Sequence, residues 1–433
     1  MSETLGRLKT DLGERSTYDA ASQCSRCGYC EQACPTYVAT GHESKSPRGR
    51  NQLLRLMLEG KLSDPKTAEE AFATCLLCGA CSTACYAHVS VPDLVLEGRR
   101  MLREKPHWLT RTATRLLVDR PGLFAFILKT AHLLKKLGLS RLGRPFLSKL
   151  GLHGLAEADK HVKDVPLTFL SGLLKTKPKV AAPEWLYFAP CGPNFLYPKV
   201  GQATVAVLDE LKGPGNSLDN GCCGLLPYNY GEVSDARALA KRVIEDAEAS
   251  GEIPVVADCS SCAAFLKTYP QLFLDDIAWK ERSERFASRV QDAVQALGDA
   301  SDKLPAVAST ERTTYHDSCR ACHGQGLRAE PRKAMKKLSG ESFKELPESD
   351  VCCGGAGAFS FVQPELSDEV LRRKIGCIAA SQAALVVTSS TSCLVQLAHG
   401  LKKYYPEGRV MHLSEYAAEA LARQKKHGTP TGA

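Results

Sequence analysis

Two cysteine-rich stretches decide how the first part of this chain folds: residues 24–35 read CSRCGYCEQACP, and residues 75–86 read CLLCGACSTACY. Both have the spacing Cys-x2-Cys-x2-Cys-x3-Cys, which places four thiols on one short segment. Thiolates are soft ligands that suit iron–sulfur clusters and zinc. Zinc sites usually use paired Cys-x2-Cys units, whereas this longer run is typical of [4Fe–4S] ligation. The pattern therefore predicts two [4Fe–4S] clusters in preference to two zinc sites.

The fourth cysteine of each run predicts how the two clusters are connected. In bacterial two-cluster ferredoxins, which share this spacing, the fourth cysteine of one run ligates the other cluster. The two ligand sets expected in a domain of residues 1–98 are Cys24, Cys27, Cys30 and Cys85, and Cys75, Cys78, Cys81 and Cys34. Between the runs, Arg48 and Arg50 either tune the cluster potentials by charge and hydrogen bonding or lie in a solvated turn.

The composition is that of an ordinary globular protein apart from its cysteines. Of the 433 residues, 44% are hydrophobic and 24% are charged, which excludes a mainly disordered chain. The N-terminus has no apolar signal-peptide core, and no apolar run approaches the ~20 residues of a membrane helix. We therefore expect a cytoplasmic location. Persistent disulfides are rare there, and 19 cysteines is an odd number, so the thiols are expected to bind metal.

Residues 99–180 are predicted to form a basic helical connector. Residues 99–149 contain 13 Lys and Arg against two acids, in a chain of net charge +8. Because the charge is confined to one segment, nucleic acid is not the expected partner. The helix expected around residues 124–137 either lies in a bilayer interface, at the cytoplasmic face of the inner membrane, or packs in a core with a solvated basic face. The basic surface also suits an acidic flavoprotein.

An internal repeat organises the rest of the chain. From about residue 181, short β-like runs such as WLYFAP and TTYHDSC alternate with helical runs, which predicts α/β folding. Cys-Cys-Gly occurs at residues 222–224 and 352–354, and each copy has cysteines upstream and downstream at nearly constant offsets. We therefore expect two duplicated α/β domains, residues 181–305 and 306–433. Strands that end at cysteines should bring these thiols to one rim of each sheet.

Several motifs resemble a known family: CGYCEQACPTY, SPRGR, YHDSC followed by GQGLR, and LPESDVCCGGAG. The repeats look like the cysteine-rich CCG domains of heterodisulfide reductase-like proteins. The fusion of a two-cluster ferredoxin domain to two such repeats resembles the iron–sulfur subunits of glycolate oxidase over nearly the whole chain. The resemblance implies a multi-domain α+β and α/β fold, in which an N-terminal helical ferredoxin-like domain with two [4Fe–4S] clusters precedes two duplicated CCG domains.

The resemblance also implies metal sites in the repeats, and the two sites are unequal. The matching cysteines are Cys191, Cys222, Cys223, Cys259 and Cys262 in the first repeat, and Cys319, Cys352, Cys353 and Cys393 in the second. In the wider family a complete set of five can bind a non-cubane [4Fe–4S] cluster, so one is expected in the first repeat. Ser390 stands where the first repeat has Cys259, which leaves an iron–sulfur cluster or zinc open for the second.

Further polar residues flank the second site. Cys322 either supplies another ligand or is an incidental thiol. His316, Asp317 and His323 either hydrogen-bond to the metal ligands or have structural roles, and the structural role is the simpler interpretation for each.

The expected function follows from what the sequence lacks as well as from its cysteines. The chain contains no P-loop and no convincing dinucleotide fingerprint. Oxidation of a hydroxy acid needs a flavin or nicotinamide, so we expect this step on an FAD-containing dehydrogenase subunit, and no catalytic residue in this chain. The resemblance implies an electron-transfer subunit that serves the oxidation of glycolate to glyoxylate or of D-lactate to pyruvate. Electrons would pass to a quinone or another carrier.

Three other functions stay open at this point. A heterodisulfide reductase-like subunit would reduce a disulfide at the paired cysteines. The chain also has the organisation of the iron–sulfur subunit of anaerobic glycerol-3-phosphate dehydrogenase. A structural protein with zinc in all four sites is the third, and it would be colourless instead of brown.

Overall fold

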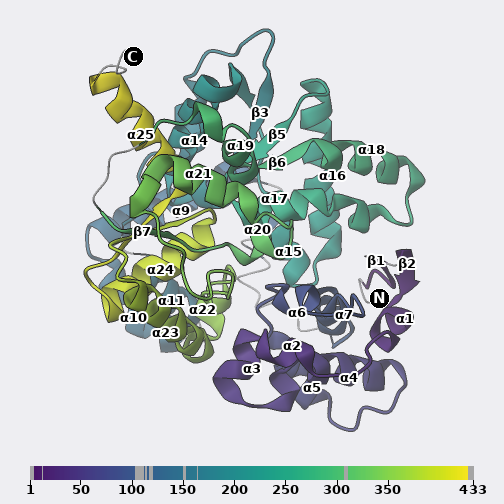
Figure 1. Ribbon diagram of the computed structural model, residues 1–433. Helices are drawn as coiled ribbons and strands as arrows, with labels where there is room; N and C mark the ends of the chain where they lie inside the picture. The colour runs from purple at the N-terminus through teal and green to yellow at the C-terminus, as the bar shows by residue number, and fades with distance from the viewer. Residues whose placement is uncertain are drawn as a thin grey trace.

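The structure is a computed structural model that describes residues 4–11, 13–102, 112, 115–116, 120–149, 153–162, 164–306 and 311–427. A helical N-terminal part and two α/β repeats pack together, and the helices of the connector contact both repeats (Figure 1). Part of the predicted basic connector, including residues 103–111, lies outside the described residues. Of the helices that are described, none is long and apolar enough to cross a membrane.

The N-terminal part consists mainly of short helices. Its elements are β1 (Arg7–Thr10), β2 (Gly13–Ser16), α1 (Thr17–Ser22), α2 (Tyr29–Gln32), α3 (Pro35–Thr40), η1 (Glu43–Lys45), α4 (Pro47–Leu58), α5 (Pro65–Ala73), α6 (Ala80–Thr83) and α7 (Val91–Leu102). β1 and β2 form an antiparallel hairpin, which the sequence pattern did not predict. Helices α4 and α7 pack against each other, and each buries an apolar face that includes Leu54 or Leu94.

The connector consists of helices with an unusual exposed face. Its described elements are α9 (Pro121–Lys136), α10 (Ser140–Lys149), α11 (His153–His161) and α12 (Leu170–Lys175). In α9 the buried residue is His132, whereas Phe126 is 69% exposed and Leu134 is 44% exposed. The interpretation of this stretch as a core-packing helix is therefore wrong for most of its length, because apolar side chains such as Phe126 and Leu134 face solvent, whereas Phe124 packs against Phe195. The basic side chains are partly paired instead, since Lys135 and Arg144 both contact Asp159.

The first repeat is an α/β domain with a four-stranded parallel sheet in the order β4-β3-β5-β6. Its elements are β3 (Trp185–Phe188), α13 (Cys191–Phe195), α14 (Pro198–Lys212), β4 (Gly215–Ser217), α15 (Leu225–Asn229), α16 (Val233–Ala249), β5 (Val255–Ala257), α17 (Ser260–Lys267), η2 (Tyr269–Phe273), α18 (Ile277–Arg289), β6 (Val290–Asp292), α19 (Ala293–Asp299) and η3 (Ser301–Lys303). The apolar runs predicted as strands form β3 and β5, whose residues are all buried.

The second repeat has the same topology. Its elements are β7 (Thr313–Tyr315), α20 (Cys319–Cys322), α21 (Ala329–Ser339), η4 (Gly340–Ser342), α22 (Phe359–Val362), α23 (Pro364–Ser381), β8 (Leu385–Thr388), α24 (Thr391–Tyr404), β9 (Arg409–His412) and α25 (Leu413–His427). The three strands are parallel in the order β7-β8-β9. A parallel bridge from Thr313 to Phe343 takes the position of β4.

The two repeats face each other about an approximate two-fold relation. Helix α14 of the first packs against α25 of the second, and the equivalent pair α21 and α19 also packs together. Near the centre, the Ser260 amide donates to the Ser389 carbonyl oxygen at 3.1 Å, and the Tyr315 hydroxyl donates to Ser389 Oγ at 3.1 Å. Because Ser260 and Ser389 follow β5 and β8, the carboxyl ends of both sheets meet at this interface.

The N-terminal part contacts both repeats. The buried guanidinium of Arg100 forms an ion pair with Glu97 and lies 4.4 Å above the centre of the Tyr228 ring in the first repeat. Thr83 Oγ1 lies 3.0 Å from His323 Nδ1 in the second repeat. The second contact places the second cysteine run, which contains Thr83, next to the second repeat.

Arg100→Ala is expected to lower the free energy of unfolding by about 3–5 kcal/mol, because it leaves the buried carboxylate of Glu97 without its cation. Arg282→Ala is the control, since it breaks a partly exposed pair with Glu248 and should cost less than about 1 kcal/mol. Denaturant titration of anaerobic protein, followed by circular dichroism, measures both changes. Similar small losses for the two variants would contradict a stabilising role for Arg100.

Candidate metal centres

The first N-terminal group consists of thiols from both cysteine runs. Burial and the neighbouring thiols of Cys24 and Cys85 raise the pKa of Cys30 to about 11. Cys27 lies on the same loop and is exposed. The fourth cysteine of the second run, Cys85, is therefore brought to the cysteines of the first run.

The second N-terminal group likewise combines the two runs, because Cys34 of the first run lies with three cysteines of the second. Cys34, Cys75, Cys78 and Cys81 line one small cavity together with Arg50. Burial, together with the thiols of Cys75 and Cys34, raises the pKa of Cys81 well above its usual range. Four thiols around one cavity provide the number and type of ligands that a [4Fe–4S] cluster uses.

Backbone conformation explains why each run curls around its thiols. Arg26 and Gly28 in the first run have φ of 60° and 84°, and Leu77 and Gly79 occupy the same positions of the second run with φ of 53° and 83°. Glycine adopts this left-handed conformation freely, whereas Arg and Leu adopt it at a cost of about 1–3 kcal/mol each. The same costly conformation in both runs indicates a loop shape imposed by what the loop encloses.

Arg50 lies beside the second group and is almost fully buried, at 1% exposed. Its Nη1 donates to Cys34 Sγ at 3.7 Å, and its Nε donates to the Ala71 carbonyl oxygen at 2.7 Å. The sequence left open whether Arg50 lies in a solvated turn or beside the thiols. Its burial shows that the solvated turn is wrong for Arg50. Arg48 is more exposed and pairs with Glu31 at 2.7 Å.

The first repeat brings its predicted cysteines together at the carboxyl ends of β3, β4 and β5: Cys191, Cys222, Cys223, Cys259 and Cys262. The Cys223 thiol donates to Cys262 Sγ at 3.4 Å. A hydrogen bond with Cys262 lowers the pKa of Cys259 to about 6, whereas contacts with Cys223 and then Cys259 raise the pKa of Cys262. Five adjoining thiols are more than a single zinc ion or a cubane cluster needs.

The second repeat likewise gathers its four cysteines at the strand ends: Cys319, Cys352, Cys353 and Cys393. Ser390 precedes helix α24, which carries Cys393, and its hydroxyl is 3.6 Å from Cys259 Sγ of the first repeat. Ser390, which stands where a cysteine would complete the second repeat, therefore contacts a thiol of the first repeat across the approximate two-fold axis.

His316 lies with the cysteines of the second repeat. The structural role favoured from the sequence did not predict this position. One of its ring nitrogens lies within 4.8 Å of the sulfurs of Cys353 and Cys393. The side chain is fully buried, and neither ring nitrogen has a hydrogen bond of ordinary geometry with another described residue, although the Ser349 backbone acts on the ring. Burial lowers the pKa of His316 well below its usual range, so the imidazole is neutral. Comparison of the two repeats in the sequence could have singled out His316, because the equivalent position at the end of β3 holds the apolar Phe188.

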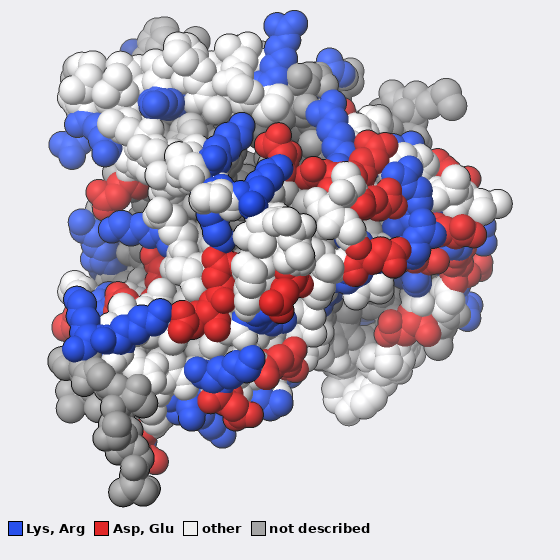
Figure 2. Space-filling view, turned by 90° about the horizontal axis from the view of Figure 1, so that it is seen from above, with Lys and Arg blue, Asp and Glu red and all other residues white. Residues whose placement is uncertain are grey.

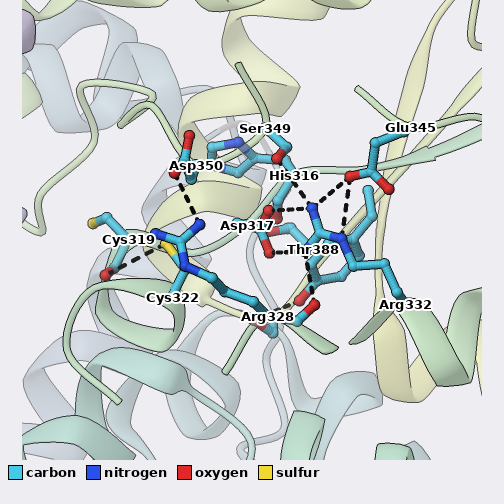
Figure 3. A network of polar contacts seen from close by, with 12 residues as sticks. His316, Asp317, Cys319, Cys322, Arg328, Arg332, Glu345, Ser349, Asp350 and Thr388 are labelled. Atoms are coloured by element: carbon cyan, nitrogen blue, oxygen red, sulfur yellow. Dashed lines mark hydrogen bonds and ion pairs between the residues drawn. The ribbon is translucent and has the colours of Figure 1, made fainter. Parts of the chain in front are cut away.

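The other residues that flank this site have structural roles (Figure 3). The Asp317 carboxylate accepts hydrogen bonds from both terminal nitrogens of Arg332, at 2.6 and 2.7 Å. His323 contacts the N-terminal part as described above. The Cys322 thiol contacts the carbonyl oxygen of Cys319, at 3.8 Å within its own helical turn. This contact does not direct the Cys322 sulfur to the other thiols.

Comparison with known proteins agrees with these two kinds of site. The family described as "4Fe-4S dicluster domain" matches residues 20–89, and the family described as "Cysteine-rich domain" matches twice, at residues 185–267 and 313–398. Over 441 residues the chain is 29% identical to the probable glycolate oxidase iron-sulfur subunit of Bacillus subtilis (strain 168), which covers 96% of this chain and 98% of the relative. This chain belongs to the glycolate oxidase iron–sulfur subunit family.

Other relatives agree with this assignment. The glycolate oxidase iron-sulfur subunit of Escherichia coli (strain K12) is 28% identical over 414 residues, which is 93% of this chain and 94% of the relative. Lactate utilization protein A of Exiguobacterium sp. (strain ATCC BAA-1283 / AT1b) is 31% identical over 246 residues, which is 55% of this chain and 98% of the relative. The predicted dicluster domain and the duplication of the CCG domain are both confirmed.

In this glycolate oxidase-type chain, successive thiol groups adjoin one another. Cys30 of the first N-terminal group is close enough to contribute to the raised pKa of Cys81 in the second. Burial and the Cys319 thiol raise the pKa of Cys78, and Cys78 packs in one apolar cluster with Cys352. The second N-terminal group therefore faces the thiols of the second repeat.

Arg50→Met is expected to lower the midpoint potential of the cluster in this cavity by up to about 60 mV. A reduced cluster carries an additional negative charge, so a guanidinium that donates to Cys34 stabilises the reduced form more than the oxidised one. A hydrogen bond to a charged group contributes about 1.5 kcal/mol, which corresponds to about 60 mV for a one-electron couple.

The matched control is Arg55→Met on the same helix, because Arg55 pairs with Glu59 away from the thiols. Anaerobic redox titration followed by electron paramagnetic resonance gives the potentials of both variants. A potential unchanged by Arg50→Met would show that the guanidinium does not stabilise the reduced cluster.

Proposed function

We propose that this chain is the electron-transfer subunit of a flavin-dependent 2-hydroxy-acid dehydrogenase that oxidises glycolate to glyoxylate or D-lactate to pyruvate. The observation that carries the proposal is the succession of adjoining thiol groups, from the exposed Cys27 to Cys81, which shares one apolar cluster with Cys222 of the first repeat. The names of the relatives, which refer to glycolate oxidase and to lactate utilization, support the two candidate substrates. When bound, iron–sulfur clusters accept and release single electrons.

The cysteines suit this role in number and in chemistry. We assign one [4Fe–4S] cluster to each N-terminal set predicted from the spacing, with Cys34 and Cys85 exchanged between the runs. The left-handed residues at Arg26 and Leu77 fold each loop around its thiols. In the first repeat, five adjoining thiols suit the non-cubane [4Fe–4S] cluster that the family resemblance implies.

Substrate oxidation takes place, in this proposal, on an FAD-containing partner subunit. Such a step removes two electrons at once, whereas iron–sulfur clusters carry single electrons. The rings of Tyr29 and Tyr86 lie 5.6 Å apart beside the first N-terminal group and are 66% and 85% exposed. Aromatic side chains are enriched at protein interfaces, so this pair, next to the exposed Cys27, is the proposed contact for the flavoprotein.

Reduction of a disulfide by the first repeat is the weaker alternative. The lowered pKa of Cys259 would favour a thiolate nucleophile. However, Cys222, Cys223, Cys259 and Cys262 are only 3–6% exposed, so a bulky disulfide has little access to them. Electron transfer through buried clusters does not require such access.

The α9 surface is proposed to rest on an anionic bilayer, where a membrane-dissolved quinone can accept electrons. This surface is formed by Leu123, Phe126, Ile127, Leu133 and Leu134, flanked by Lys129 and Lys136. Their spacing places the apolar residues on one stripe of the helix, opposite the buried His132. An apolar stripe with flanking lysines is typical of helices that lie in a bilayer interface. By contrast, Lys and Arg alternate with Asp and Glu on the face that Figure 2 shows.

Without a partner, the reconstituted chain is expected to be inactive toward glycolate and D-lactate. The test is anaerobic, with a flavin assay of the preparation and then addition of substrate while the visible absorbance of the clusters is followed. Addition of the FAD-containing partner should produce bleaching that depends on substrate. Bleaching by substrate without partner or bound flavin would refute the transfer-subunit proposal.

Phe126→Ser combined with Leu134→Ser is expected to weaken binding to phosphatidylglycerol vesicles by about tenfold or more. Burial of each side chain in the interface contributes on the order of 1 kcal/mol, and the serines remove both contributions. Ile277→Ser is the control, because Ile277 is 77% exposed on α18 of the first repeat. Vesicle sedimentation measures binding, and failure of the unmodified chain to sediment would contradict the membrane contact.

A further inference from the structure

The second repeat contains a donor set that differs in kind from the other cysteine groups. Within the part of the chain that the structure describes, one group of three His, Cys, Asp or Glu residues has its ligand atoms within 4.8 Å of one another: His316, Cys353 and Cys393. A single tetrahedral zinc ion with Zn–S bonds of about 2.3 Å holds its ligand atoms about 3.8 Å apart. A cubane cluster instead spreads its thiolates over four irons at separate corners. The spacing of this group therefore suits one ion.

Comparison of the two repeats shows that the histidine accompanies the loss of a thiol. His316 lies three residues before Cys319, and the residue three before Cys191 is Phe188. Phe188 is fully buried and belongs to the apolar core. The repeat with five thiols thus has an apolar residue here, whereas the repeat with four thiols has an imidazole.

The imidazole has at most a backbone contact with Ser349, which leaves one ring nitrogen for a metal ion. The side chain of His316 is fully buried. Within the described part of the chain, no hydrogen bond of ordinary geometry reaches either ring nitrogen, and the Ser349 backbone is the one hydrogen-bonding group that acts on the ring. A buried polar group without a partner costs about 1–3 kcal/mol. A metal ion bound to one nitrogen removes part of this cost and uses the neutral form of histidine, which is the form that binds metals.

The surroundings also balance the charge of such a centre. The Cys352 thiol contacts that of Cys353 and is the adjoining donor for a fourth position, although its sulfur lies outside the 4.8 Å spacing of the other three ligands. Three thiolates, one imidazole and Zn²⁺ carry a net charge of −1, by the charges of the groups. The ammonium of Lys374, which is 1% exposed, donates to the carbonyl oxygens of Glu348 and Ser349 and lies near the paired thiols. This buried cation offsets the negative charge.

We propose that the second repeat binds one zinc ion through His316, Cys353 and Cys393, with Cys352 as the fourth ligand. The proposal rests on the proposed function only in that both repeats hold metal, and it does not depend on the substrate. Zinc has no redox chemistry. Electrons would then leave the N-terminal clusters through the first repeat, while the zinc centre fixes the loop at Cys352 against Cys78.

The test measures metals in the full chain purified anaerobically. We expect about one zinc per chain in addition to iron and sulfide, since one tetrahedral set holds one ion. Zinc X-ray absorption should show both sulfur near 2.3 Å and nitrogen near 2.0–2.1 Å, as distances of about these lengths are typical of the two ligand types. Zinc-free protein with its full iron content, or a shell of sulfur alone, would overturn the proposal.

Variants separate a ligand from a merely structural histidine. His316→Phe, which copies the first repeat, should lower the zinc content to about one tenth or less, because loss of an outer partner of a ligand already costs about 10- to 100-fold in affinity. His316→Cys should retain zinc with a shell of sulfur only. Full zinc content in His316→Phe would refute the role of this side chain.

The matched control is His412→Phe. His412 is also buried at a strand end of the same sheet, and its Nδ1 accepts a hydrogen bond from the Ser414 amide at 3.1 Å. This variant should keep its zinc, and the iron content of every variant reports whether the rest of the chain has folded. Absence of iron from the unmodified protein would count against the electron-transfer function. Absence of zinc from protein that contains its full iron would count against this site alone.

Discussion

The burial of many thiols close to one another is the constraint on which this structure depends. Burial and neighbouring sulfurs raise the pKa of Cys78, Cys81 and Cys353, so without a cation these groups resist ionisation. Thiolates are nevertheless the form that binds metal, and the metal supplies the positive charge that they need. Metal binding and folding are therefore linked. The buried cations Arg50 and Lys374 also offset the negative charge of the thiolates, since each lies beside a group of sulfurs.

The duplication determines where these groups lie. Parallel strands bring cysteines to the carboxyl ends of each sheet, and the approximate two-fold relation turns both sets of ends toward one interface. Exact symmetry is not needed for this packing. Ser390 and His316 differ from their counterparts in the first repeat, and each lies beside a thiol group and not in the supporting helices. Differences of this kind change what a site binds and leave the fold intact.

Cysteine spacing and strand pattern were sufficient to predict the dicluster domain, the repeat and strands β3, β5, β7 and β8. The spacing also predicted which thiols meet, because ligands near in sequence can share a cluster only in a few ways. The burial of Arg50 and the placement of His316 could not be read in this way, since both depend on neighbours distant in sequence. The exposed apolar face of α9 was equally hidden, because a helical period is the same whether its stripe meets a core or solvent.

Unequal access of solvent also makes the N-terminal clusters unequal toward molecular oxygen. Among the described cysteines Cys27 alone is exposed, whereas Cys34, Cys78 and Cys81 are buried. Oxygen can therefore approach the cluster bound by Cys27 directly, but it must penetrate packed side chains to reach the other. We expect iron to be lost in air from the first cluster before the second. In the proposed complex, contact with a partner over Tyr29 and Tyr86 would cover the same surface, so assembly itself would protect the cluster at which electrons are proposed to enter.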